Sequence, residues 1–134
     1  MNKKRFVLVL LVMMFLASCG GGPSTTLEVV MTDFQFTPNN YTVPAGEEIT
    51  INIVNNGAVV HNFVIMKLGT SAGDTFDAED EPNVYWQETD IPPNGDTTTT
   101  FTAPAEPGEY QVVCRTAGHI ASGMIGKLTV VTAE

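Results

Sequence analysis

The sequence predicts a single all-β domain built as a sandwich of two sheets. Short β-branched runs with alternating polar and apolar residues recur along the chain, and such runs are typical of half-buried strands. Pro, Gly and Asn separate these runs at near-regular spacing, and no segment keeps a 3.6-residue apolar period for three helical turns. Short strands spaced in this way favour a β-sandwich, and 134 residues fit one domain.

The predicted strands follow one another from Leu27 onward. Each is a run of β-branched or alternating residues bounded by turn formers, and the runs are 27–31, 49–54, 59–66, 97–102, 109–114 and 127–131. The turn signals lie at 38–40, 44–46, 55–57, 92–95 and 107–108. The segment 71–90 shows no alternation and carries seven acidic residues. We therefore expect it to be an excursion from the sandwich, with room for one helical turn.

The N-terminal residues are predicted to be an export signal and not part of the fold. A positive stretch at 2–5 precedes an unbroken apolar run at 6–16, which is the pattern of a signal peptide. As a helix, the apolar run would be about 16 Å long, roughly half of a bilayer's hydrocarbon core. It is therefore too short for a stable transmembrane span.

The residues Leu16-Ala17-Ser18-Cys19-Gly20 resemble the lipobox of bacterial lipoproteins, which implies cleavage before Cys19 and acylation of that residue. The expected division is a signal peptide at 1–18, a lipidated Cys with a flexible tether at 19–26, and the folded domain at 27–134. The protein would then be extracytoplasmic and lipid-anchored to a bacterial cell membrane. Cys114 would be the only thiol left in the exported domain, which calls for an explanation.

Composition excludes several classes of function. Without residues 1–18 the formal charge is 3 − 15 = −12, since only Lys67, Arg115 and Lys127 remain basic. No basic stripe is available to neutralise phosphates, so nucleic-acid binding is excluded. Two His and two Cys cannot supply a multicopper enzyme, or a four-ligand zinc site together with a catalytic centre.

Four residues carry metal-binding chemistry: His61, Cys114, His119 and Met124. A trigonal site of two His and one Cys with a weak axial Met is the arrangement of blue-copper electron-transfer sites. Cys114 ends a predicted strand, and His119 and Met124 lie in the loop that follows, whereas His61 begins a strand after the turn at 55–57. Each residue alone also has an ordinary interpretation, as a hydrogen-bonded core histidine, a small hydrophobic residue or a core-filling methionine.

The segment 108–128 resembles the ligand loop of the cupredoxins, the small blue copper proteins, and its Cys-x4-His-x4-Met spacing is similar to that of auracyanins. The stretches Asp33–Pro38, Val43–Gly46 and His61–Val64 also match the family pattern, so the resemblance covers about residues 27–131. It implies a Greek-key β-sandwich that holds one type 1 copper ion. The implied copper ligands are His61, Cys114, His119 and Met124.

The resemblance also implies a supporting contact from Asn62, which follows the first ligand. In the family this Asn ties the two ligand-bearing segments together. The residue after the ligand Cys is commonly Ser or Thr, but here it is Arg115. We therefore expect Asn62 to bond to Thr116 or to the backbone instead.

The implied function is electron transfer by a copper ion that cycles between Cu(I) and Cu(II), not enzymatic catalysis. A single mononuclear site with its strong positions occupied leaves no open position for a substrate. The alternative is a copper carrier or storage protein without a dedicated redox partner. The expected partners of an electron carrier are other redox proteins, and we expect a monomer.

Two surface features bear on how partners would dock. We expect the ring of His119 to lie near the surface, within an apolar rim formed by Ile120, Ala121 and Ala58 or Val59. The acidic run 77–81 would steer a basic partner such as a cytochrome. The ordinary interpretation of that run is a solvated loop.

Overall fold

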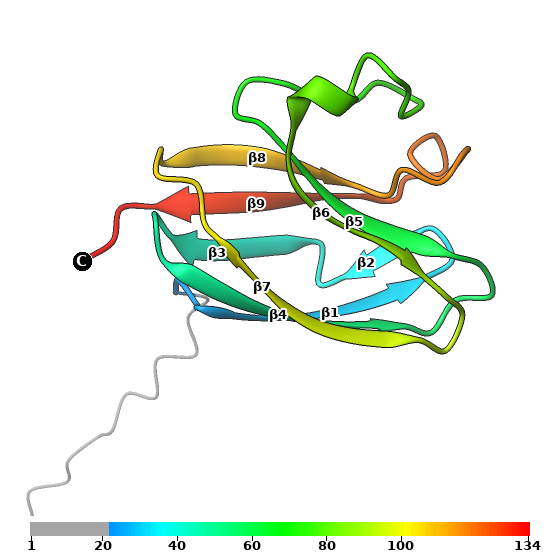
Figure 1. The fold of residues 1–134 in the computed structure, drawn as a ribbon, viewed down its shortest axis with the longest axis horizontal. Helices are drawn as coiled ribbons and strands as arrows, with labels where there is room; N and C mark the ends of the chain where they lie inside the picture. The colour runs from blue at the N-terminus through cyan, green and yellow to red at the C-terminus, as the bar shows by residue number, and fades with distance from the viewer. Residues whose placement is uncertain (1–21) are drawn as a thin grey trace, which may run out of the picture.

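A computed structural model describes residues 22–134 as two β-sheets packed face to face (Figure 1). The strands are β1 (Thr26–Thr32), β2 (Gln35–Thr37), β3 (Asn40–Pro44), β4 (Glu48–Asn55), β5 (His61–Met66), β6 (Val84–Ile91), β7 (Asp96–Thr102), β8 (Gly108–Val113) and β9 (Ile125–Val131), with one short 3₁₀ helix, η1 (Glu81–Asn83). The predicted signal peptide 1–18 and Cys19 lie outside the described residues.

Within residues 22–134 there is no helix with the length and hydrophobicity needed to cross a membrane.

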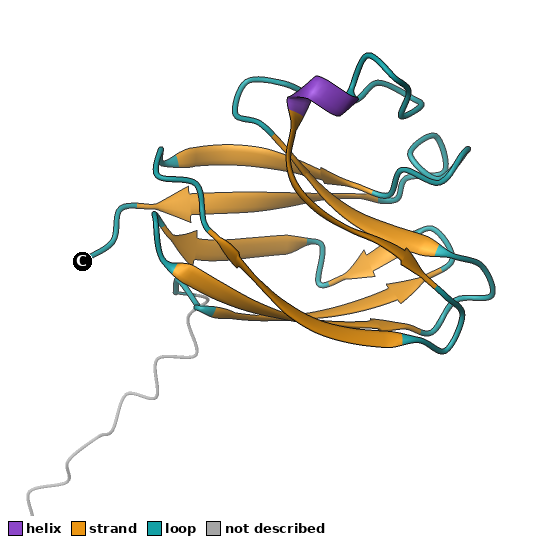
Figure 2. Cartoon of the chain, viewed as in Figure 1, coloured by secondary structure: helices purple, strands orange, loops and turns teal. Residues whose placement is uncertain are grey.

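One sheet has four strands in the order β2-β1-β4-β7, and the other has five in the order β3-β9-β8-β5-β6. The pairs β1–β4 and β3–β9 are parallel, and the remaining pairs are antiparallel. Figure 2 shows the strands in two layers with the 3₁₀ turn outside them. The predicted all-β sandwich is confirmed.

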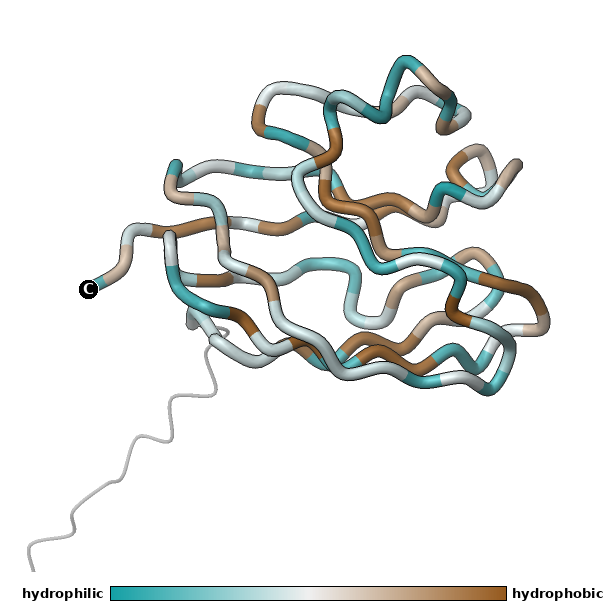
Figure 3. The backbone as a smooth tube through the Cα atoms, in the orientation of Figure 1, coloured by the Kyte–Doolittle hydropathy of each residue, from teal (hydrophilic) through white to brown (hydrophobic). Residues whose placement is uncertain are grey.

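Alternating side chains of the two sheets form the core. On β4, Ile49, Ile51 and Ile53 are fully buried while the residues between them are partly exposed, and Figure 3 shows this alternation of hydropathy along the strands. Phe63 of β5 packs in a T-shaped arrangement against Phe36 of the opposite sheet and against Tyr41 of its own sheet, at centroid distances of 5.4 and 5.5 Å. Such edge-to-face packing adds to the burial of the rings and fixes the position of β5.

The extent of the acidic excursion was predicted wrongly, because β6 occupies its second half. Only residues up to Asn83 lie outside the sheets, and the expected helical turn is η1. β6 is an edge strand that pairs only with β5, through shifted register. Its side chains are mostly half-buried on both faces, so no alternation marks it in the sequence. The short strands β2 and β3 were also not predicted.

The strand ends bring Asp33 and three of the predicted site residues to one pole of the sandwich. Asp33 directly follows β1, and His61 is the first residue of β5. Cys114 follows β8, and Met124 precedes β9. The first described residues lie at the opposite pole (Figure 1). There Thr26, which the sequence placed in the tether, begins β1, and Ser24 donates its N–H to Thr42 O at 2.9 Å.

Candidate metal centre

Three of the predicted ligands come together inside the protein. The Nδ1 atoms of His61 and His119 lie 3.2 Å apart, and they lie 3.8 and 3.3 Å from Cys114 Sγ. His61 and Cys114 are fully buried, and His119 is only 5% exposed. Their three donor atoms all lie within 4.8 Å of one another, close enough to hold one metal ion.

The size and chemistry of this triangle fit a copper ion. A triangle with these sides has its centre about 2 Å from each corner, close to the bond length between imidazole nitrogen and first-row metals. Thiolate and imidazole are the soft donors that copper selects. The three donors therefore suit one copper ion without moving apart or together.

The loop between β8 and β9 places three of the four predicted ligands. His119 N–H bonds to Thr116 O at 3.1 Å, Met124 N–H bonds to His119 O at 2.9 Å, and Cys114 N–H bonds to Met124 O at 3.3 Å. The loop is thereby closed on itself, and Met124 is fully buried in the same core cluster as Cys114. Backbone hydrogen bonds thus hold the thioether residue next to the two ligands of its loop.

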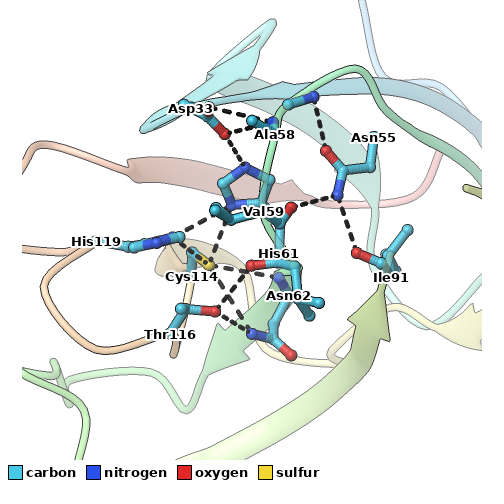
Figure 4. A network of polar contacts seen from close by, with 12 residues as sticks. Asp33, Asn55, Ala58, Val59, His61, Asn62, Ile91, Cys114, Thr116 and His119 are labelled. Atoms are coloured by element: carbon cyan, nitrogen blue, oxygen red, sulfur yellow. Dashed lines mark hydrogen bonds and ion pairs between the residues drawn. The ribbon is translucent and has the colours of Figure 1, made fainter. Parts of the chain in front are cut away.

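Asn62 connects the segment of His61 to this loop. Its backbone N–H points at Cys114 Sγ at 3.4 Å, and its side-chain NH₂ donates to Thr116 Oγ1 at 2.9 Å. Thr116 in turn donates to Val60 O at 3.1 Å, and Asn62 Oδ1 accepts the Asp90 N–H at 2.9 Å. The contact expected between Asn62 and Thr116 is present, and Figure 4 shows it beside the sulfur.

Arg115 contacts residues outside the donor triangle. Its guanidinium donates to Gln87 Oε1 at 2.8 Å, pairs with Glu81, and lies 4.6 Å from the centre of the Phe76 ring. Arg115 directly follows Cys114 in the sequence. Its contacts with Phe76 and Glu81 therefore connect the acidic excursion to the ligand loop. A groove of about 620 Å³ lies beside this residue, and its lining is Val60, Asn62, Thr89, Asp90, Arg115 and Thr116.

Asp33 contacts the buried ligand His61, and this contact was not predicted from the sequence. Its Oδ1 lies 3.1 Å from His61 Nε2, and its two oxygens accept the Ala58 N–H at 3.0 and 3.1 Å (Figure 4). The hydrogen bond from Ala58 holds the pKa of the Asp33 carboxyl below its usual value, His61 acts in the same direction, and desolvation opposes both. The only sequence signal was its place in a matched stretch of the family pattern.

Asn55 organises the loop between β4 and β5. Its fully buried side chain donates to Val59 O at 2.8 Å and to Ile91 O at 2.9 Å, and its Oδ1 accepts the Gly57 N–H at 2.8 Å. The sequence marked 55–57 only as a turn. In the structure this side chain fixes the loop that leads into His61.

The expected apolar rim is only partly correct. Ile120 is 5% exposed and packs into a small core cluster, so it is not part of the surface. Phe34 takes that place, because its 43% exposed ring meets His119 edge-on at a centroid distance of 5.0 Å. Phe34 is therefore the exposed apolar residue in contact with His119, and the expected Ala58, Val59 and Ala121 are exposed as well.

Phe34 has a φ of 72°, a strained conformation for a bulky residue that is often found near functional sites.

Burial lowers the pKa of His119, the neighbouring His61 adds to this effect, and Asp33 opposes it. A lower pKa keeps the imidazole neutral, as a metal ligand must be.

The family model and the known proteins that match this chain agree with one another. A family model described as a cupredoxin-like domain matches residues 5–130. Auracyanin-A of Chloroflexus aurantiacus (strain ATCC 29366 / DSM 635 / J-10-fl) is 32% identical over 146 residues, which cover 87% of this chain and 89% of the relative. Plastocyanin of Mercurialis perennis is 33% identical over 98 residues, which cover 73% of this chain and 89% of the relative.

Solved structures show the same similarity. Dithionite-reduced auracyanin from Roseiflexus castenholzii superposes with a TM-score of 0.70 at 34% identity, over 82% of this chain and 99% of the other. Auracyanin A from Chloroflexus aurantiacus, described as a "blue" copper protein, superposes with a TM-score of 0.64 at 30% identity, over 82% and 100%.

Proposed function

Because the chain belongs to the cupredoxin-like family of blue copper proteins, we propose that it is a membrane-anchored, extracytoplasmic electron carrier with one type 1 copper ion. The proposed ligands are His61, Cys114 and His119, with Met124 as the weak axial ligand. The observation that carries the proposal is the buried triangle of donor atoms, which all lie within 4.8 Å of one another. A copper ion held there would supply one-electron chemistry between Cu(I) and Cu(II).

The residues around the triangle support electron transfer because they keep the donors in place. Cys114 Sγ faces the Asn62 N–H, and the loop from Cys114 to Met124 is closed by its own backbone hydrogen bonds. If the donors had to rearrange at each electron transfer, the rearrangement would cost free energy. A fixed arrangement serves both oxidation states. Burial also excludes water, which would otherwise compete as a ligand.

The same features argue against a copper carrier or storage protein. Such proteins must release their metal, whereas the donors here are buried in the core of a sandwich. Incubation of the copper-loaded protein with a copper-binding partner separates the two functions. Retention of copper together with rapid electron exchange supports the electron carrier, and rapid loss of copper without electron exchange supports the alternative.

We also propose that Cys19 anchors the mature protein and that the copper centre faces away from the membrane. The described chain begins at the pole opposite to His61 and Cys114 (Figure 1). A tether attached there would leave the pole with His119 free for partners. We also place the protein outside the cytoplasm, because residues 2–16 have the pattern of an export signal.

The anchor leads to a prediction for Cys19→Ala. Loss of the thiol removes the only acylation site in the lipobox-like sequence, so the variant should not be acylated or cleaved before residue 19. Mass spectrometry of the membrane and soluble fractions checks this, with Cys114→Ala as a control that should still be acylated. Wild-type protein that is unmodified, water-soluble and begins well after Cys19 would contradict the anchor.

The surface charge suggests a basic redox partner, such as a basic cytochrome. All three basic residues among residues 22–134 are already bonded, Lys67 to Pro82 O, Arg115 to Glu81 and Lys127 to Glu109. Only Arg115 and Lys127 pair with acidic groups, so most of the 15 acidic residues have no Lys or Arg partner in the described structure. Clustered negative charge accelerates encounter with a positive partner, and salt suppresses that effect.

We predict that transfer of an electron to a basic cytochrome slows as salt rises from 0.01 to 0.15 M. The Debye length falls from about 30 to about 8 Å over that range. The double variant Asp74→Asn/Glu79→Gln should lower the low-salt rate a few-fold, since both side chains are exposed and hold no contact in the described structure. Asp77, Asp80 and Glu81 are avoided because they bond within the segment or to Arg115.

The control for this stopped-flow measurement is Glu47→Gln/Glu48→Gln, which removes the same charge at the opposite pole. That variant should react nearly as fast as the wild type. If neither salt nor the Asp74/Glu79 variant changes the rate, the acidic segment is a solvated loop and the proposed steering is wrong.

A further inference from the structure

We propose that Asp33 is a positioning residue for the copper centre, which lowers the reduction potential by accepting a hydrogen bond from the remote nitrogen of His61. This inference rests on the proposed function and deepens it. Asp33 lies outside the predicted ligand set, and through this contact it influences which oxidation state of copper the centre prefers.

The two nitrogens of His61 have different surroundings. Nδ1 faces the interior of the triangle, 3.2 Å from His119 Nδ1 and 3.8 Å from Cys114 Sγ. Nε2 lies on the other side of the ring, 3.1 Å from Asp33 Oδ1. A neutral imidazole whose Nδ1 binds a metal carries its proton on Nε2. Asp33 is therefore placed to accept that proton's hydrogen bond and to fix the tautomer and the plane of the ring.

The structure around Asp33 is built for this contact. The Ala58 N–H bonds to both carboxylate oxygens and so orients the group toward His61. Gly57 lies against the contact, and a Cβ at this position would lie 2.4 Å from Asp33 Oδ1 and 2.7 Å from His61 Nε2. Only a residue without a side chain can therefore pass there with the hydrogen bond intact.

A carboxylate affects a metal ligand more strongly than a neutral acceptor does. It raises the basicity of the imidazole that it contacts, and such supporting contacts typically change metal affinity 10- to 100-fold. Its negative charge also favours the more highly charged Cu(II) state over Cu(I). The effect is moderated because the Asp33 side chain is 36% exposed, but His61 is fully buried. The contact should therefore hold the potential below the value that a neutral acceptor would give.

The first test compares the reduction potentials of the copper-loaded wild type and Asp33→Asn. The amide oxygen can still accept the Ala58 N–H, so the turn should be retained while the charge is lost. We expect the preference for Cu(II) over Cu(I) to fall by about tenfold, which for a one-electron couple raises the potential by about 59 mV. The visible band should remain, since the three donors are unchanged.

The matched control is Asp96→Asn, which removes an exposed carboxylate from the same pole without a side-chain contact in the described residues. It should shift the potential by less than half as much as Asp33→Asn. Equal shifts in the two variants would show a general charge effect and overturn the specific role of Asp33. A blue Asp33→Asn variant with the wild-type potential would overturn it as well, while leaving the proposed function intact.

A second measurement uses the wild type and needs neither copper nor a variant. Proton–nitrogen NMR of the metal-free protein, at a pH where the imidazole is neutral, reports which nitrogen of His61 carries the proton. We expect the proton on Nε2, with slow exchange because of its bond to Asp33. A proton on Nδ1 would overturn the inference. A wild type that binds copper without a blue colour would overturn both this inference and the proposed function.

Discussion

Replacement of Cys114 with serine should abolish the blue colour of the copper-loaded protein and leave the sandwich folded. The colour of such a centre requires the bond between sulfur and copper, and a hydroxyl cannot replace the thiolate in it. Cys114 is fully buried, and its sulfur lies 3.3 Å from His119 Nδ1 and 3.4 Å from the Asn62 N–H. Serine is slightly smaller and polar, so His119 and Asn62 both lose the sulfur atom that they contact in the wild type.

Visible and far-UV spectra of the variant check this expectation together. The visible band should vanish, while the β-sheet signal of the metal-free protein should match the wild type. The control is Cys19→Ser, which changes the other cysteine and should keep the colour. A Cys114→Ser protein that remains blue would show that the ligand assignment is wrong.

Replacement of Asn55 with alanine should destabilise the metal-free protein by about 2–4 kcal/mol, because it leaves buried backbone groups without partners. The Asn55 side chain satisfies Val59 O, Ile91 O and the Gly57 N–H, and it is fully buried. Each unsatisfied buried group costs about 1–3 kcal/mol. Water that enters the loosened loop can bond to these groups, which reduces the total cost of the three lost hydrogen bonds.

Urea unfolding of the metal-free protein measures this effect, as a lower midpoint at an unchanged m value. Asn52→Ala on the same strand is the control, since Asn52 bonds at the surface to Glu28 and Thr98 and should cost only about 0.5 kcal/mol. Because the Asn55 loop leads into His61, the variant should also lose copper faster. Equal midpoints for the two variants would show that Asn55 does not support the loop.

The sequence was sufficient for the parts of the site that lie within one loop. Cys114, His119 and Met124 keep a spacing that hydrogen bonds of a single loop enforce, so the pattern is visible without a structure. His61 was also predicted, because it begins a strand directly after a clear turn. Asp33 was not, since its contact with His61 joins residues 28 positions apart and a single Asp carries no spacing pattern.

The same distinction explains the errors in the fold and the rim. Strand β6 has half-buried side chains on both faces, so the period of two that reveals β4 is absent. Ile120 was expected at the surface because it follows His119, but the turn of the loop directs it into the core cluster with Val64 and Met66. Phe34 reaches His119 only because the turn after β1 brings it across the pole.

The central claim is that His61, Cys114, His119 and Met124 form a type 1 copper centre that exchanges electrons. The most direct test is a redox titration of the copper-loaded protein followed by its visible absorption, together with a determination of the copper content. The account predicts one copper ion per chain and an intense blue band that dithionite bleaches and reoxidation restores over repeated cycles. Stoichiometric copper without the blue band, or a band that is lost with the metal on the first reduction, would contradict it.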